Sequence, residues 1–248
     1  MLNINETSFA VIIPVYNEEI VIQKCIEQVI CILSKITEKS IIVVVDDGST
    51  DSSNKILNSL LDKHKKLNLI TNKINSGYGG ALQSGIQFAL LNGYKYVLFM
   101  DSDLTNDPID IIKFHKKMVE GFDVIKATRY AVGGGFIDVN WKRILISKIG
   151  NYISCKLFGI PISDCTNGFR AIKTELYLNT TYTEKGFPFI VEELYSWRDK
   201  ILLYCEISVV LKSRDSMAKS SSFVYDLNTY LSYLKYPFLA FIQRTKYF

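Results

Sequence analysis

Short apolar runs alternate with longer segments of helical periodicity through the first half of the chain. The runs have the length of buried strands, and the longer segments repeat apolar residues every three or four positions, as helices packed on one face do. The predicted strands are Phe9–Val15, Ile41–Val45, Leu67–Thr71 and Val97–Met100. Helical spacing follows the first three strands, beginning at Ile22, Ile56 and Leu82. This alternation predicts an α/β fold with a parallel sheet, right-handed crossovers and flanking helices.

The second half of the chain is less regular. Its predicted elements are a helix over Pro108–Glu120, a strand over Asp123–Thr128, a helical segment from Trp141, a turn over Thr166–Arg170, a helix over Phe189–Lys200 and a strand over Leu203–Leu211. Asp107 and Pro108 suit the N-cap and the first position of a helix. We therefore assign residues 1–222 to one α/β domain and residues 223–248 to a C-terminal amphipathic helical tail.

The tail carries an apolar stripe at helical spacing. The stripe consists of Leu227, Leu231, Leu234, Phe238 and Phe241, and the accompanying tyrosines are Tyr225, Tyr230, Tyr233, Tyr236 and Tyr247. Lys235, Arg244 and Lys246 outnumber Asp226, and Pro237 is expected to kink or divide the helix. Tyrosine rings and basic side chains favour a membrane surface, whereas no apolar stretch reaches the roughly 18 residues of a span. The alternative is that the stripe packs on the α/β domain or on a membrane partner subunit.

The composition disfavours several classes of protein. The 29 basic and 25 acidic residues give a net charge of +4, which is too mild to indicate a nucleic acid partner. The five cysteines are scattered and there are only two histidines, so a Cys/His zinc site is not expected. Reduced cysteines, together with an N-terminus that lacks the basic-then-apolar pattern of a signal peptide, predict a cytoplasmic protein.

Polar and acidic residues follow three of the predicted strands. Tyr16 and Glu18 follow the first strand, Asp47 follows the second, and Asp101 and Asp103 follow the fourth. Parallel strands end at one edge of a sheet, so these side chains should converge in the crevice where open α/β sheets bind ligands. Two acids one residue apart suit a hard divalent cation that is shared with substrate phosphates. The alternative is a solvated acidic turn.

Glycines and arginines raise further possibilities. The turn from Asn75 to Gly80 lacks the G-x-G-x-x-G spacing of dinucleotide-binding folds and the Gly-Lys-Ser/Thr of a P-loop. Arg143 and Ser147 lie four residues apart and would share one helix face. The arginines of the second half are either members of surface ion pairs or parts of an anion site.

Six segments carry a family resemblance when they are taken together. They are Pro14-Val-Tyr-Asn-Glu18, Val45-Asp-Asp-Gly-Ser-Thr-Asp51, Asp101-Ser-Asp103, Arg129-Tyr130, Gly168-Phe-Arg170 and Arg214. This set resembles the family-two glycosyltransferases, most closely the dolichol-phosphate mannose synthases and related polyprenyl-phosphate sugar transferases. The similarity runs in order over about residues 8–222. Asp-Asp-Gly-Ser with a downstream Asp-x-Asp is a strong signal for the superfamily. The set of Arg129, Trp141, Arg143, Ser147 and Gly168-Phe-Arg170 is moderately specific for the polyprenyl-phosphate branch.

The resemblance implies a GT-A fold, with its Rossmann-like nucleotide-binding sheet, and a hexosyltransferase that works with inversion on the cytoplasmic face of a membrane. The donor would be GDP-mannose or a UDP-sugar, and the acceptor a dolichyl or undecaprenyl phosphate. The residues expected at the nucleotide are Pro14, Tyr16, Glu18, Val45, Asp47 and Asp101. Asp101 and Asp103 would hold Mg²⁺ or Mn²⁺, and Arg214 would close over the donor phosphates. The residues expected at the acceptor phosphate are Arg129, Arg143 and Ser147.

The chain departs from the family pattern at two positions. Thr105 stands where the family usually has a glutamine, and it is a shorter ligand that reaches a metal only through water or not at all. The lysine after Arg214 is displaced by one position, so no role is assigned to Lys219. These differences leave the donor sugar open.

The acceptor decides whether the reaction needs a general base. A lipid monophosphate has a second pKa near ~6 and is largely dianionic at neutral pH, so it attacks without one. A sugar hydroxyl must lose its proton to a base, for which Glu192 and Glu193 are candidates. Transfer to a glycan or another hydroxyl in surface polysaccharide synthesis is therefore the second hypothesis. A catalytically silent subunit that binds sugar nucleotides is the third.

Overall fold

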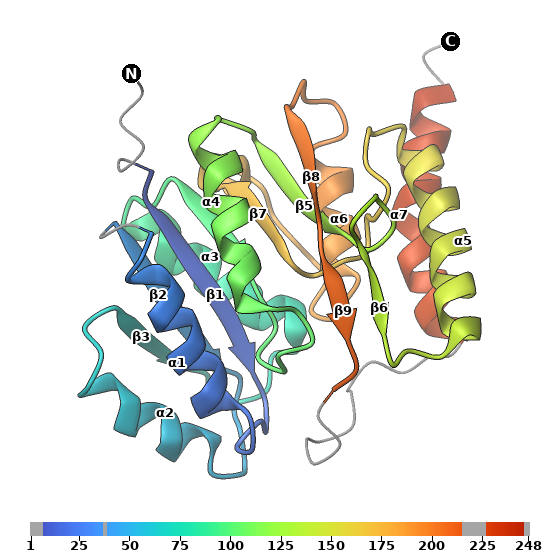
Figure 1. Cartoon of the computed structure of the whole chain (residues 1–248). Coiled ribbons are helices and arrows are strands. Elements are labelled where there is room, and N and C mark those ends of the chain that lie inside the picture. The colour runs from blue at the N-terminus through green and yellow to red at the C-terminus, as the bar shows by residue number, and fades with distance from the viewer. Residues whose placement is uncertain (1–6, 37–38, 215–226, 246–248) are drawn as a thin grey trace.

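The computed structural model describes residues 7–36, 39–214 and 227–245. A central sheet of seven strands has the order β3-β2-β1-β4-β7-β5-β8 (Figure 1). Its strands are β1 Phe9–Val15, β2 Ser40–Asp46, β3 Leu67–Thr71, β4 Tyr96–Phe99, β5 Val124–Thr128, β7 Arg170–Lys173 and β8 Tyr204–Ser208. β1, β2, β3 and β4 are mutually parallel, which confirms the arrangement predicted for the first half.

Strand β7 is an element of the central sheet that the sequence did not reveal. It runs antiparallel between β4 and β5 and hydrogen-bonds with both. Its sequence, Arg-Ala-Ile-Lys, has only two apolar residues, too few to stand out as a strand pattern. β5 pairs with β8 in parallel on its other side, so β7 joins the two parts of the sheet.

Helices cover both faces of the sheet. On one face lie α1 Ile22–Leu33, α2 Ser53–Leu61 and α4 Ile111–Val119, which pack with the side chains of Val11 and Ile13. On the other lie α3 Tyr78–Leu91 and α6 Phe189–Ser196, which pack with Ile12 and Phe99. The alternating residues of β1 thus supply both halves of the core, as expected for a buried parallel strand.

Helices α5 Trp141–Phe158 and α7 Leu227–Thr245 lie side by side at one end of the sheet (Figure 1). They form a third apolar cluster with α6, to which α5 contributes Cys155 and Phe158, and α7 contributes Tyr236 and Ala240. α7 continues across Pro237, so of the two predicted effects of this residue, a kink or a division of the helix, the division does not occur. The tail therefore packs on the domain through one face, while Leu231 and Phe238 of the predicted stripe are exposed.

Tyr225, Asp226, Lys246 and Tyr247, like Lys219, lie outside the described residues, and for Leu227, Tyr230 and Arg244 only the backbone is described.

Three smaller features complete the fold. Strand β9, Val210–Lys212, pairs in parallel with β6, Gly135–Ile137, so the strand predicted over Leu203–Leu211 is two strands in different sheets. The 3-10 turns are η1 Pro108–Asp110 and η2 Thr174–Tyr177. Asp107 caps η1 as predicted, because its side chain accepts a hydrogen bond from the Ile109 amide. α6 ends at Ser196 rather than at Lys200.

Candidate active site

A cavity of about 840 Å³ lies beyond the carboxyl ends of β1, β2, β4 and β5, between the sheet and helices α5 and α7. Nine of the predicted site residues line it: Pro14, Tyr16, Glu18, Asp47, Asp101, Asp103, Arg129, Ser147 and Arg214. Val45 does not, because its side chain is buried in the core with Ile12. Arg143 is exposed on α5 and is not among the lining residues either.

Asp47 holds the glycine-containing turn that begins α3. Its carboxylate accepts hydrogen bonds from the amides of Ser76 and Gly77 at 2.9 and 2.8 Å, and from the Ser76 hydroxyl at 2.6 Å. Gly77 has a φ of +82°, a conformation that glycine adopts at no steric cost. The acid of the second strand end thus fixes the wall of the cavity from which Tyr78 projects.

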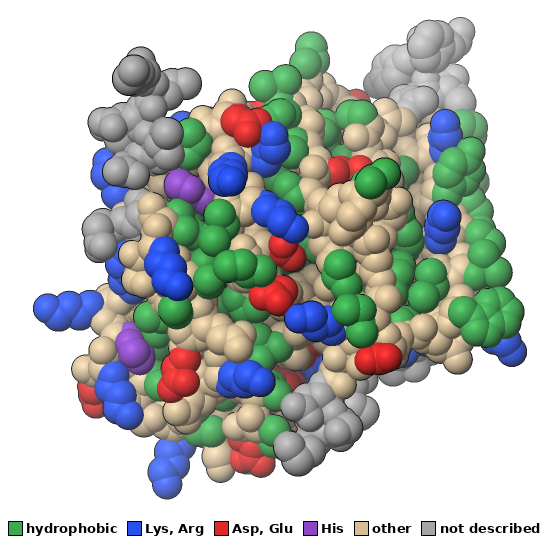
Figure 2. Space-filling model, viewed as in Figure 1, with side chains coloured by type: hydrophobic (Ala, Val, Ile, Leu, Met, Phe, Trp, Pro, Cys, Tyr) green, Lys and Arg blue, Asp and Glu red, His purple; other side chains and the backbone are tan. Residues whose placement is uncertain are grey.

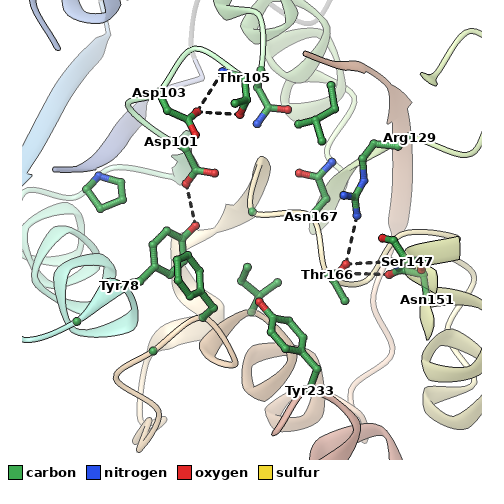
Figure 3. A pocket seen from close by; sticks show the side chains of 18 of the residues that line it. Tyr78, Asp101, Asp103, Thr105, Arg129, Ser147, Asn151, Thr166, Asn167 and Tyr233 are labelled. Atoms are coloured by element: carbon green, nitrogen blue, oxygen red, sulfur yellow. Dashed lines mark hydrogen bonds between the residues drawn. The ribbon is translucent and has the colours of Figure 1, made fainter. Parts of the chain in front are cut away.

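The two acids after β4 lie close enough to influence each other (Figure 3). Asp101 accepts a hydrogen bond from the Tyr78 hydroxyl at 3.1 Å. Burial, and then the neighbouring charge of Asp103, raise the pKa of Asp101 to about 6. The hydroxyl and the amide of Thr105 both donate to Asp103 Oδ1, at 2.7 and 3.0 Å. Thr105 therefore orients Asp103 through a hydrogen bond.

Arg214 bridges the acids of two different strand ends. Its Nε donates to Asp103 Oδ2 at 2.8 Å and its Nη2 to Glu18 Oε1 at 2.7 Å. A guanidinium therefore stands where carboxylate oxygens from β1 and β4 converge. This arrangement fits a divalent cation, because the acids already require a positive charge among them. No group of three His, Cys, Asp or Glu side chains in the described parts of the chain could hold a metal, so the donor phosphates and water would complete the set.

The opposite side of the cavity is built around Arg129. Its guanidinium donates to both oxygens of Asp164, at 2.7 and 2.8 Å, and to the Thr166 hydroxyl at 3.2 Å. Asp164 is fully buried, so this bidentate pair fixes the arginine. Asn151 donates to the same Thr166 hydroxyl at 3.0 Å, and the hydroxyls of Ser147 and Tyr130 lie 2.7 Å apart. Arginine, hydroxyl and amide groups thus converge where an anion can bind.

The cavity opens toward an apolar wall. Ile146, Ile149 and Ile153 of α5 line it, together with Tyr233 and Leu234 of α7. The three isoleucines are also 45–50% exposed, so they belong both to the cavity and to the outer surface. Figure 2 shows hydrophobic side chains with basic ones between them over α5. The cavity therefore combines an acidic side, a cationic side and an apolar opening.

Several of these residues escaped the sequence analysis. Tyr78, Asn151 and Asp164 reach the cavity or its supports only through the tertiary fold, and no local pattern marks them. Lys126, whose ammonium donates to the carbonyls of Cys165 and Asn167 beside the cavity, had a signal in the sequence, because it is the single lysine within the predicted strand Asp123–Thr128. Glu192 and Glu193, the candidate bases, do not line the cavity. Glu193 pairs with Arg170 at 2.7 Å, and Glu192 accepts hydrogen bonds from the amides of Thr183 and Glu184.

Comparison with known proteins places these features in context. The model of the family described as glycosyl transferase family 2 matches residues 10–179. Polyprenol monophosphomannose synthase of Mycolicibacterium smegmatis is 29% identical over 195 residues, which cover 76% of this chain and 70% of that protein. An uncharacterized protein of Methanocaldococcus jannaschii is 42% identical over 178 residues, covering 66% of this chain and 71% of that protein.

Solved structures agree on the fold. Glucosyl-3-phosphoglycerate synthase from Mycobacterium tuberculosis, in complex with Mn²⁺, uridine diphosphate and phosphoglyceric acid, matches with a TM-score of 0.66 and 15% identity. The match covers 96% of this chain and 78% of that chain. The same synthase in complex with Mg²⁺ and uridine diphosphate matches with a TM-score of 0.65 and 14% identity, over 95% and 79% of the two chains.

Proposed function

The chain belongs to glycosyl transferase family 2 and is a glycosyltransferase with the GT-A fold, and from this premise we propose that it transfers a hexose to a polyprenyl phosphate. The donor is a nucleoside diphosphate sugar, the reaction depends on Mg²⁺ or Mn²⁺, and the anomeric configuration is inverted. The observation that carries the proposal is the division of one cavity into an acidic side, a cationic side and an apolar opening. The name of the mycolicibacterial relative, which combines mannose with a polyprenol, supports the same assignment.

The acidic side suits the donor. Asp101 and Asp103 would hold the cation, and Tyr16 and Glu18 at the end of β1 line the part of the cavity in which a nucleotide would lie. When bound, the divalent cation would stabilise the negative charge that develops on the nucleoside diphosphate as the anomeric C–O bond breaks. Arg214 would exchange its carboxylate partners for the donor phosphates, which arginine binds through paired hydrogen bonds. GDP-mannose and UDP-sugars are the donors to test.

The cationic side suits a phosphate nucleophile. Arg129 carries positive charge into the cavity beside the hydroxyls of Ser147 and Thr166. A phosphate monoester is largely dianionic at neutral pH and needs orientation rather than deprotonation. The engagement of Glu192 and Glu193 with other groups outside the cavity disfavours transfer to a hydroxyl, which requires a base. We retain Arg143 as a proposed contact to the headgroup, approached from the exposed side of α5.

The apolar opening suits a lipid substrate presented by a membrane surface. α5 contains Lys142, Arg143, Lys148 and Lys156 and no acidic residue. Its exposed side chains include Trp141 and Tyr152, the aromatic types enriched at membrane interfaces. No helix in the described part of the chain is long and apolar enough to cross a membrane. We therefore propose peripheral attachment on the cytoplasmic face, through α5 as well as the tail helix α7.

Transfer from radiolabelled GDP-mannose and UDP-hexoses to a prenyl phosphate in detergent tests the proposal, with and without Mg²⁺. A thermal-shift screen of nucleoside diphosphates with Mn²⁺ identifies the base first, because a ligand of the folded state raises apparent stability. The Asp103→Asn variant should keep its fold and lose divalent-dependent transfer. Equal transfer to a prenyl alcohol, or wild-type turnover in that variant, would contradict the proposal.

A further inference from the structure

Lys126 is a fully buried lysine in the middle of strand β5. Its ammonium donates hydrogen bonds to the backbone carbonyls of Cys165 and Asn167, at 3.2 and 2.7 Å. No ion pair of Lys126 is found among the described residues, so peptide oxygens are its recorded partners. Neither the motifs of the sequence nor the proposed chemistry assigns this residue a role.

The two carbonyls belong to the loop that separates the acidic and cationic sides of the cavity. Thr166, Asn167 and Gly168 of this loop line the cavity, and Figure 3 shows Thr166 and Asn167 between Asp101 and Ser147. The carbonyl of Gly168 accepts a hydrogen bond from Arg170 Nη1 at 2.7 Å. Lys126 and Arg170 are paired residues of adjacent strands. Two buried cations of the sheet, Lys126 and Arg170, therefore bind three of the loop's carbonyl oxygens.

Burial of the Lys126 ammonium lowers the stability of the fold, which suggests that the lysine has a function. Burial of an ammonium with only neutral partners is strongly unfavourable, and an apolar residue would suit β5 better. Burial, followed by repulsion from Arg170, lowers the pKa of Lys126 to about 8. The lysine nevertheless remains mostly charged at neutral pH.

We propose that Lys126 is a positioning residue of the acceptor site, which holds the loop 165–168 in place and supplies positive potential beneath the bound acceptor anion. This inference rests on the proposed function, because it assumes an anionic acceptor beside Arg129 and Thr166. The loop presents the Thr166 hydroxyl to that position, and the charge of Lys126 acts through the loop without contacting substrate. Lys126 would thus raise affinity for the acceptor rather than for the donor.

The surroundings of Lys126 permit this role. Charged and titratable groups face it from β7 (Arg170), α6 (Glu193) and the loop (Asp164, Cys165). Glu193 is paired with Arg170 and Asp164 with Arg129, so both acids are already matched by arginines. Glu206, its register neighbour on β8, accepts hydrogen bonds from Ser163. The hydrogen bond with Cys165 lowers the pKa of Cys155, so Cys155 is replaced as a control for thiol titration.

The test is the pH dependence of acceptor affinity. The KM for a short-chain prenyl phosphate is measured from pH 6.5 to 9.5 at saturating donor, beside the KM for the donor. Above pH 7 the acceptor phosphate stays dianionic, so its own titration does not interfere. We expect the wild-type acceptor KM to rise roughly tenfold through an inflection near pH 8, as the loss of one nearby charge predicts. The donor KM should lack this inflection.

Variants separate charge from simple support of the loop. Lys126→Met should show the high acceptor KM at every pH, and Lys126→Gln, which keeps an amide donor without the charge, should also lose the inflection. Cys155→Ala should retain it, and Lys116→Met, at an exposed lysine of α4, serves as the matched control. A wild-type acceptor KM without the inflection, or an inflection that persists in Lys126→Gln, would overturn the inference. If the Lys126 variants fail to fold, the profiles of the wild type and of Cys155→Ala together decide the matter.

A second probe distinguishes failure of this inference from failure of the proposed function. Absence of transfer to prenyl phosphate by the wild type would refute the proposed function alone. Sulfate, which does not titrate in this range, is then titrated calorimetrically with the Arg214→Ala variant, so that binding reports the Arg129 side. Weaker sulfate binding above pH 8, abolished by Lys126→Gln, would support the role of Lys126. Sulfate binding that is independent of pH would refute it.

Discussion

Removal of Arg214 should make the free protein bind divalent cations more tightly. In the absence of ligands its guanidinium donates to Asp103 and Glu18 at 2.8 and 2.7 Å, so a cation that binds Asp103 must first displace it. The Arg214→Ala variant leaves these oxygens available. The same variant should transfer sugar more slowly, because Arg214 is the proposed partner of the donor diphosphate.

The magnitude follows from the two contacts. A hydrogen bond between charged groups contributes about 1.5–3 kcal/mol, but the arginine side chain is 21% exposed and solvent screens the pair. A net cost of about 1–2 kcal/mol for displacing the arginine corresponds to a 5- to 30-fold change in the Kd of the metal. The Kd of Mn²⁺ should fall by that factor in Arg214→Ala without nucleotide.

Electron paramagnetic resonance of free Mn²⁺ measures this affinity directly at pH 7. Lys212→Ala is the matched control, because Lys212 lies two residues away and pairs with the exposed side of Asp107 at 3.0 Å. Its metal affinity should equal that of the wild type. Unchanged or weaker Mn²⁺ binding by Arg214→Ala would refute the idea that arginine and metal compete for the same oxygens.

Three further predictions concern other parts of the site. Asp101→Asn should stabilise the free protein against urea by about 1–2 kcal/mol at pH 7.5. The pKa of Asp101 in the folded protein is raised to about 6, so keeping this carboxylate ionised above pH 6 costs folding free energy. The stability gained by the variant should vanish near pH 4, and equal stability of variant and wild type at pH 7.5 would contradict the prediction. Arg143→Ala should raise the acceptor KM about tenfold and leave the donor KM unchanged in steady-state assays, and unchanged acceptor kinetics would remove Arg143 from the site. The double variant Trp141→Ala with Tyr152→Ala should lower co-sedimentation with anionic liposomes at least tenfold. The double variant Leu91→Ala with Ile201→Ala, at exposed positions elsewhere, should not lower it. Equal liposome binding by the two double variants would exclude α5 as the attachment surface.

The sequence predicted best those parts of the fold that depend on local patterns. β1 and β3 have the predicted bounds. The acids after β4 lie at the cavity because residues that directly follow a strand must lie at the sheet edge where that strand ends. β7 escaped prediction because Arg170 is a charged residue whose burial depends on Glu193, a partner 23 positions away. The bidentate hold of Asp164 on Arg129 likewise depends on two loops that only the completed sheet brings together.

Formation of strand β7 also determines when, during synthesis, the acidic and cationic sides of the cavity can come together. Asp101 follows β4 and Arg129 follows β5, yet these two strands are joined only through β7, which hydrogen-bonds with both. Without residues 170–173 the sheet would be two separate sheets, β3-β2-β1-β4 and β5-β8. During synthesis the apolar edges of β4 and β5 therefore stay unpaired until β7 emerges, and open edges of this kind are templates for aggregation. A ribosome-bound chain that stops before residue 170 should thus require a chaperone, and closure of the sheet by β7 is the step that first brings the two sides of the cavity together.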